Sequence, residues 1–167
     1  MPSDALPRIF LFIALIGAGL LAGATFGIWR GYDPRGLDAA AFVAVHQEAV
    51  RGLNVLLPAL GFLTIACLAV SAFLRRRERP ALWLLLAAIV FMVASGAVTR
   101  FLNQPINAEV MGWSRTSVPA NWQELRESWW YWHVSRTLTT FAGFVLIAGT
   151  ALWGAAADGP ERRRAPP

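Results

Sequence analysis

Apolar residues in this chain are gathered in four blocks that polar connections separate. The first three blocks run over residues 9–29, 53–74 and 81–102. A membrane-crossing helix needs about 20 predominantly apolar residues, so each of these blocks is long enough to cross a bilayer. The fourth block is uncharged only over 138–153, and we predict that its helix extends back to about residue 125. The pattern predicts an all-α fold, an integral membrane four-helix bundle that forms a single membrane domain over residues 1–167.

The first apolar block follows Arg8 and contains small residues, as a signal peptide would. Its apolar stretch is longer than the 7–15 residues or so of a signal-peptide core, which favours a retained helix. The composition excludes two classes of reaction mechanism. The single Cys67 excludes an internal disulfide and thus a four-helix thiol oxidoreductase. The chain contains no lysine, which excludes a Schiff-base mechanism.

Positive charge is concentrated in two segments, RRRERP at residues 75–80 and ERRR at 161–164. Because basic residues are enriched on the cytoplasmic side of membrane proteins, we predict a multi-pass protein of the cell membrane with both termini cytoplasmic. The turn at 75–80 and a basic tail over 158–167 then lie in the cytoplasm, and the connections 30–52 and 103–131 face outward. The net charge of +5 is explained by this topology, so the expected partner is the lipid bilayer and not a nucleic acid.

Most of the unusual polar side chains fall at the outward ends of the predicted helices. A four-helix bundle brings these ends together, so the sequence predicts an outward-facing polar pocket. The candidate residues are Asn54, Asn103, Asn107, Arg126 and Arg136, with His46 and His133.

The segment before the fourth apolar block has a helical period. Asn121 and Glu124 resemble a capping box. A helix that begins there places one set of side chains at alternating steps of three and four, which is a single face. That face consists of Trp122, Arg126, Trp129, His133, Arg136 and Thr140. We expect it to point into the bundle, whereas Trp130, Tyr131 and Trp132 fall elsewhere and suit an aromatic belt at the bilayer surface.

Three features of the backbone and of charge burial lead to expectations about this end of the bundle. Arg136 at membrane depth needs a partner or water, and Glu109 or Glu48 would serve. Pro58 has no N–H to bond the carbonyl of Asn54, so we expect a kink that widens the bundle. Pro105 is expected to end or bend the third helix, whose loosened backbone the neighbouring asparagines could bond.

The segments NQPIN at residues 103–107 and WQELRESWWYWHVSRT at 122–137 resemble those of the anthrone oxygenase-like family of small four-helix membrane proteins. The resemblance covers roughly residues 9–153. It implies that the family's site is lined by Asn103, Asn107, Trp122, Arg126, Trp129, His133 and Arg136. Characterised fungal relatives oxidise anthrones to anthraquinones with molecular oxygen, and most bacterial members have no assigned function.

The candidate residues suit such a reaction. An anthrone carries an acidic C–H between two aryl rings, which a base could remove before the anion reacts with oxygen without a metal. His133 is the first candidate for the base and His46 the second. Arg126 and Arg136 would hold the oxyanion, and Trp122 and Trp129 would sandwich the flat ring system.

Two other functions stay open on the sequence alone. His46 and His133 could ligate haem, or could bind a metal ion together with Glu109 or Glu48. Alternatively, small residues over 17–27 and at 95–96 would permit close helix packing in a homo-oligomer or with a partner membrane subunit, without any enzymatic role. The sequence also leaves open whether the loop over 108–120 closes the pocket as a lid.

Overall fold

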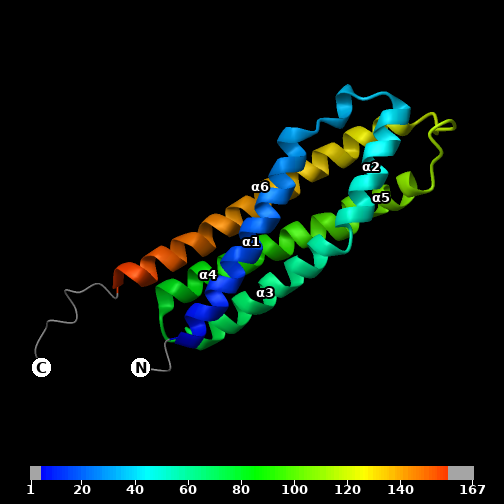
Figure 1. The fold of residues 1–167 in the computed structure, drawn as a ribbon. Coiled ribbons are helices and arrows are strands. Elements are labelled where there is room, and N and C mark those ends of the chain that lie inside the picture. Colours follow the sequence, from blue (N-terminus) through cyan, green and yellow to red (C-terminus); the bar gives the residue numbers. More distant parts are fainter. Residues whose placement is uncertain (1–4, 158–167) are drawn as a thin grey trace, which may run out of the picture.

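In a computed structural model that describes residues 5–157, the chain forms a bundle of long helices (Figure 1). Its main helices are α1 (Ala5–Gly31), α3 (Leu56–Leu74), α4 (Arg79–Val98) and α6 (Trp122–Ala157). Two shorter helices, α2 (Ala39–Leu53) and α5 (Gln104–Met111), precede α3 and follow α4. The described chain has four segments that are long and apolar enough to cross a membrane, which confirms the predicted all-α fold and makes this a membrane protein.

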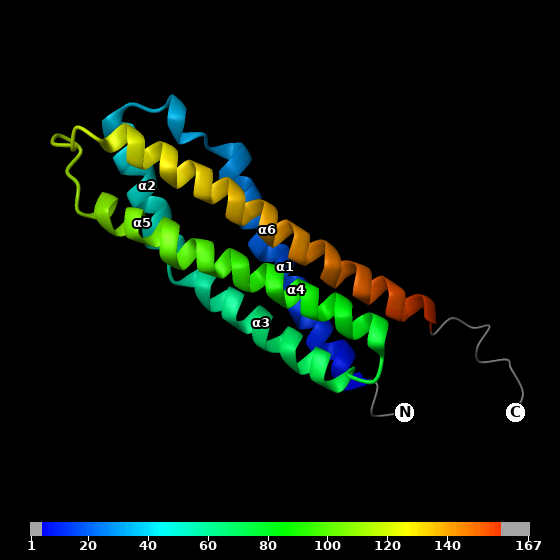
Figure 2. The same ribbon diagram turned by 180° about the vertical axis from the view of Figure 1, so that it is seen from behind.

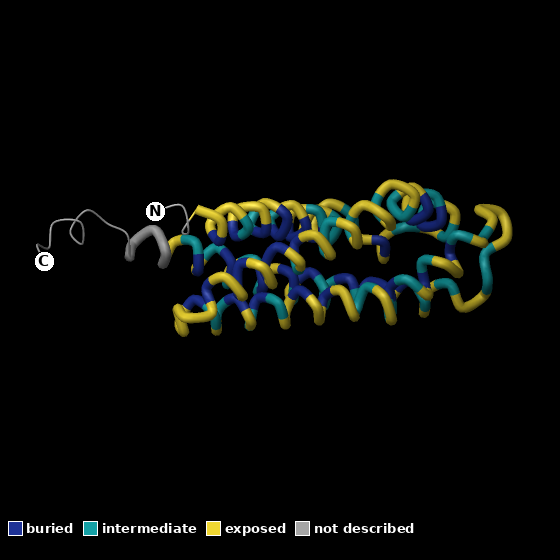
Figure 3. Tube along the Cα trace, turned by 90° about the horizontal axis from the view of Figure 1, so that it is seen from below, coloured by how far each residue is buried: buried dark blue, intermediate teal, exposed yellow. Residues whose placement is uncertain are grey.

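The four long helices run alternately up and down. Helix α1 packs against α3 and α6, and α4 packs against α3 and α6, so the bundle is a closed square of neighbours (Figure 2). Buried positions face the centre along all four helices, and exposed positions face outward (Figure 3). In the half of the bundle nearest the α3–α4 turn, the core is apolar and includes Leu68, Leu85 and Ile147. Contact between helices is close where residues are small, as at Gly17, which faces Thr64.

The short helices lie together at one end of the bundle, next to the 3-10 turn η1 (Pro34–Gly36) (Figure 1). A second apolar cluster, which contains Phe42, Val43, Val110 and Trp129, holds them to α6. The start of α1, the α3–α4 turn and the end of α6 lie at the opposite end, as the predicted topology requires. The side of the membrane on which each end lies stays a prediction, and the basic tail at 158–167 is outside the described residues.

The chain around Pro58 differs from the single kinked helix that the sequence predicts. The sequence suggested one helix from residue 53 with an internal kink at Pro58. Instead, α2 ends at Leu53, the chain turns at residues 54–55, and α3 begins at Leu56. Pro58 thus lies in the first turn of α3, where a missing N–H leaves no helical bond unmade. The break comes before the proline, and α2 is a separate helix that lies over the end of the bundle.

The third apolar block continues beyond its predicted end at residue 102. Helix α4 passes into a π-helical turn, η2 (Thr99–Asn103), in which the Gln104 N–H bonds the Thr99 carbonyl five residues back. Helix α5 then begins, with Pro105 in its first turn. Because Pro105 cannot donate to the carbonyl of Phe101, the wider turn accommodates the proline without ending the helical rod. The predicted bend is therefore a change of helical register, which rotates the side chains of α5 relative to those of α4.

Candidate functional site

The inward stripe of α6 is confirmed. Arg126, Trp129, His133 and Thr140 are buried, and Trp122 and Arg136 are half-buried. One assignment to the aromatic belt was wrong, because Trp130 is buried as well. Its ring stacks on His133 at 6.0 Å between centroids, and the Arg35 guanidinium lies over it at 5.3 Å. Tyr131 is exposed, as expected of a belt residue. The sequence missed Trp130 because its partner, Arg35, comes from the distant α1–α2 connection.

His133 is fully buried, at 0% exposure, and both of its ring nitrogens are engaged. Nδ1 accepts hydrogen bonds from the Arg136 guanidinium, from Nη2 at 2.9 Å and from Nε at 3.2 Å. An arginine can only donate, so Nδ1 carries no proton. Nε2 therefore carries the proton and donates it to the carbonyl oxygen of Thr25 on α1, at 3.1 Å. His133 is a neutral imidazole that ties α6 to α1 and fixes the direction of Arg136.

Arg136 has neutral partners throughout the part of the chain that the structure describes. Besides His133, it donates through Nη1 to the Thr99 hydroxyl in the π-helical turn, at 3.4 Å. The expected ion pair with Glu48 or Glu109 is not formed among residues 5–157. Glu48 instead pairs with Arg51, and Glu109 is exposed. The cationic group at the centre of this end of the bundle thus lacks an acidic counter-ion there.

The second histidine, His46 on α2, is 1% exposed and is held by Asn107 of α5. The Asn107 Oδ1 atom accepts from the Trp129 indole Nε1 at 2.8 Å and lies 3.1 Å from Nε2 of His46. Because an indole N–H can only donate, the Asn107 atom that faces both groups is the oxygen, and Nε2 of His46 must donate. In the described residues Nδ1 of His46 has no hydrogen-bond partner, so its lone pair is available.

Burial lowers the pKa of His46 to about 4, and the hydrogen bond to Asn107 offsets this only in part. Desolvation disfavours the charged imidazolium, so the ring is neutral at pH 7. A neutral ring with a free Nδ1 lone pair is a proton acceptor, although a weak one.

Two cavities border Arg136. The smaller, of about 40 Å³, has a mainly apolar lining that also contains the polar side chains of Tyr32, His46, Asn54, Asn107 and Arg136. It has room for water or dioxygen and not for a ring system. The larger, of about 250 Å³, lies between α1, α3, α4 and α6 and is mostly apolar. Arg136, Thr99, Leu57 and Pro58 line both cavities, so they form the wall between them.

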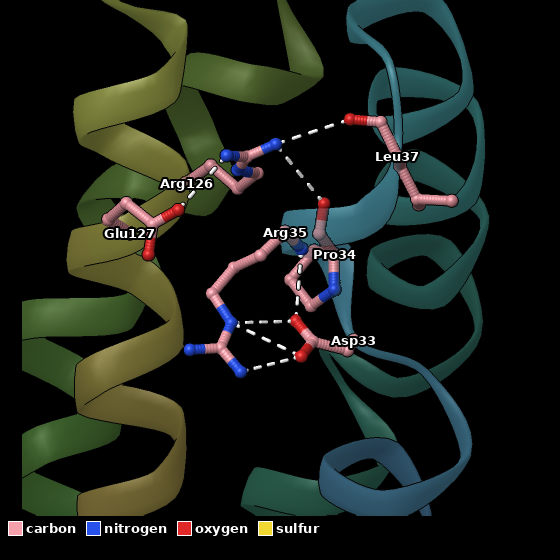
Figure 4. A network of polar contacts seen from close by, with 6 residues as sticks. All are labelled: Asp33, Pro34, Arg35, Leu37, Arg126 and Glu127. Carbon is pink, nitrogen blue, oxygen red and sulfur yellow. Dashed lines mark hydrogen bonds and ion pairs between the residues drawn. The ribbon is translucent and has the colours of Figure 1, made fainter.

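Arg126 does not join this arrangement. Its Nη1 donates to the backbone carbonyls of Pro34 and Leu37, at 3.4 and 3.2 Å, and its Nη2 pairs with Glu127 (Figure 4). The guanidinium also lies 4.8 Å from the ring centroid of Trp122. Neither Arg126 nor Trp122 lines the two cavities at Arg136. This pair fastens the α1–α2 connection to α6, so the structure does not place Trp122 and Trp129 as the two sides of a ring-binding slot.

The remaining candidates hold helices together. Asn103 is fully buried and donates to the Trp129 carbonyl at 3.0 Å. Asn54 accepts from Gln104 at 3.2 Å, which joins the start of α3 to the start of α5. The loop over 108–120 lines neither cavity, and Gln47 on α2 anchors it by donating to the carbonyls of Val110 and Trp113.

Sequence reasoning missed Thr25, Tyr32 and Thr99. A hydroxyl within an apolar block, as at Thr25 and Thr99, was the available signal. Thr25 nevertheless binds His133 through its backbone carbonyl, and because every residue has such a carbonyl, its identity as threonine does not reveal this contact.

The histidines do not fit the proposed haem or metal site. An iron between two imidazoles needs a free nitrogen on each ring, and both nitrogens of His133 are engaged. The described residues contain no group of three or more His, Cys, Asp or Glu side chains that could hold a metal ion.

A family model described as anthrone oxygenase matches residues 47–146 of the chain. The chain belongs to the anthrone oxygenase family. The match covers the region from the second half of α2 to the middle of α6, and so includes both motifs and most candidate residues. His46 lies one position before it, and Thr25 and Tyr32 precede it as well. Comparisons with curated proteins and with solved structures each found no match.

Proposed function

We propose that this protein is a membrane-embedded oxygenase that acts on a flat aromatic, anthrone- or quinone-like molecule at Arg136. The observation that carries the proposal is that Arg136, held by neutral partners, lines both cavities, and that His46, whose Nδ1 has no partner among the described residues, lines the smaller one. A cation without an acidic counter-ion favours an anion next to it. The pairing of a fixed cation with a proton acceptor suits removal of a proton to give a bound oxyanion.

The reaction balances with dioxygen as the only co-reactant. With the anthrone in the larger cavity, a water molecule in the smaller one relays a proton from its acidic C–H to His46 Nδ1, and the negative charge moves to the carbonyl oxygen beside Arg136. The electron-rich carbon of the anion then forms a bond to dioxygen. The proton on His46 passes to the distal oxygen, which leaves with the second hydrogen of that carbon as water, and the carbon becomes the new carbonyl.

Because His46 is a weak base, Arg136 must stabilise the anion that proton transfer produces. With a pKa of about 4, protonating His46 from solvent at pH 7 is unfavourable by about 3 pKa units, or about 4 kcal/mol. An anion formed beside the ring raises the pKa of the imidazole by stabilising its charged form. Arg136 stabilises the same anion, so the two groups act on one charge. His133, in this scheme, positions Arg136, and the geometry favours His46 over His133 as the base.

The membrane topology completes the proposal. Four arginines at positions 75–77 and 79 mark the α3–α4 turn. The rule that basic residues lie inside supports a cytoplasmic location for this end of the bundle. The site at the opposite end then faces the outer leaflet of the cell membrane.

The test is oxidation of anthrone by the protein purified in mild detergent, followed by quinone absorbance and oxygen uptake. The native protein should exceed the rate with heat-denatured protein, at one dioxygen per anthrone. His46→Gln should lower kcat by about 100-fold or more, the usual contribution of a general base. Arg30→Gln, an exposed change outside both cavities, is the matched control and should retain the wild-type rate. Equal rates with native and denatured protein would refute the proposal.

A further inference from the structure

The larger cavity lies open on the outer surface of the bundle, between α3 and α4. Leu21, Thr25 and Thr140 line its inner part and Pro58, Phe62 and Gly96 its outer part. The three outer residues are exposed, and Phe62 is 78% exposed. The cavity is therefore a pocket with a mouth on the side of the bundle and not at its end.

Most of the surface around this mouth is apolar, although the exposed Arg100 and the neighbouring Gln104 also line the pocket. On α3, Leu56, Leu63 and Val70 are exposed, and on α4 Val90 and Val93 are exposed. Both helices belong to segments that are long and apolar enough to cross a membrane. The side of such a bundle contacts acyl chains, so the mouth faces lipid.

Polar groups occupy defined places in the pocket. Ser95 and Thr140 bond each other at 2.7 Å. Two cations line the pocket: Arg100, which is exposed, and Arg136, which is less exposed and also borders the smaller cavity. Of its five N–H donors, three are directed at His133 and Thr99. Burying a cation without an opposite charge is unfavourable, and an anionic oxygen that accepts the remaining donors would offset this cost.

We propose that this pocket binds an apolar molecule that is dissolved in the bilayer and carries one anionic oxygen, with the apolar part between α3 and α4 and the oxygen on Arg136. The inference deepens the proposed function, on which it rests for the reaction, by assigning the ring-binding region and the lipid-facing mouth. The ligand is thus a membrane-soluble acid, such as a phenol or an enol, and not a water-soluble anion.

Two glycines keep the pocket open. Gly61 on α3 and Gly96 on α4 both line it, and a Cβ atom at either position would meet no atom within 4 Å. A larger side chain there can extend into the pocket without displacing the helices. Gly23 on α1 has the same free space and lines neither cavity at Arg136, so it provides a matched control.

The test is equilibrium binding of 9-anthracenecarboxylate to the protein in lipid nanodiscs, followed by energy transfer from tryptophan. Gly61→Leu and Gly96→Leu should weaken binding by at least 10-fold, and Gly23→Leu should bind as the wild type does. Arg136→Gln should weaken binding of this anion by at least 10-fold without changing the weaker binding of neutral 9-methylanthracene. Wild-type affinity in both pocket glycine variants would overturn the assigned pocket, and wild-type affinity in Arg136→Gln would overturn the assigned anion contact.

The same variants separate this inference from the proposed function. If the wild type binds the anion as described but does not oxidise anthrone, the binding site stands and the reaction falls. If the wild type oxidises anthrone and both pocket glycine variants do so at the same rate, the reaction stands and this pocket is not its site.

Discussion

The two asparagines of the NQPIN segment should contribute unequally to stability. The Oδ1 atom of Asn107 accepts two hydrogen bonds, from the Trp129 indole at 2.8 Å and from His46 Nε2 at 3.1 Å. Asn107→Ala leaves two donors on buried side chains without their acceptor. A lost hydrogen bond costs about 1 kcal/mol, and a buried donor left unpaired costs about 1–3 kcal/mol. We therefore expect Asn107→Ala to lower the free energy of unfolding by about 2–4 kcal/mol.

Asn103 provides the comparison. Its Nδ2 donates one hydrogen bond, to the Trp129 carbonyl, whereas its Oδ1 is buried without a partner. Asn103→Ala removes that unpaired oxygen together with the one bond, so the loss of stability should be about 1 kcal/mol. The same substitution at two nearby positions thus separates the effect of the bonds from the effect of shortening an asparagine.

Thermal unfolding in mild detergent, followed by far-ultraviolet circular dichroism, measures the difference. For a domain of this size about 1 kcal/mol shifts the Tm by about 2–4 °C, so Asn107→Ala should lower it by about 5–10 °C and Asn103→Ala by no more than about 4 °C. An equal or larger loss in Asn103→Ala would refute the assignment of the two bonds to Asn107.

Three other perturbations test separate parts of the structure. Gly17→Ala places a Cβ atom in steric conflict with the Thr64 hydroxyl and should destabilise the α1–α3 contact by about 1–3 kcal/mol in the same unfolding assay, whereas Gly23→Ala should be neutral or stabilising. The pKa of His46 is about 4 in the folded protein and about 6.5 in the unfolded chain, so its contribution to stability is present above pH 6.5 and is lost as the pH falls towards 4. Between pH 7 and pH 4.5 the free energy of unfolding of the wild type should therefore fall by about 2–3 kcal/mol more than that of His46→Gln. Arg126→Gln removes the donor to the backbone carbonyls of Pro34 and Leu37, so amide hydrogen exchange in the α1–α2 connection should become faster while exchange in the long helices stays unchanged. Unaltered exchange in that connection would contradict the role assigned to Arg126.

Periodicity was sufficient to predict which face of α6 points inward. Helical spacing fixes the direction of each side chain relative to its neighbours, so the inward positions of Arg126, Trp129 and His133 follow from the sequence without knowledge of their partners. Apolar block length likewise predicted the long helices. These properties are local, and the sequence contains them directly.

Partners across the bundle could not be predicted in the same way. The sequence offered glutamates for Arg136, but its partners are an imidazole and a hydroxyl, and His133 bonds a backbone carbonyl that has no sequence signal. The π-helical turn before Pro105 was not predicted either, because a proline signals a break in the helix without specifying its form. The shift of the proposed base from His133 to His46 follows from these contacts, because they occupy both nitrogens of one ring and leave one nitrogen of the other free.

The most direct test of the central claim is anthrone turnover by Arg136→Gln under aerobic conditions, with folding checked by circular dichroism. Removing a donor that stabilises an oxyanion typically lowers kcat by about 100- to 1000-fold, and we expect a loss of this size, with Arg136→Lys intermediate and Arg30→Gln unchanged. A folded Arg136→Gln protein that oxidises anthrone at the wild-type rate would contradict the account.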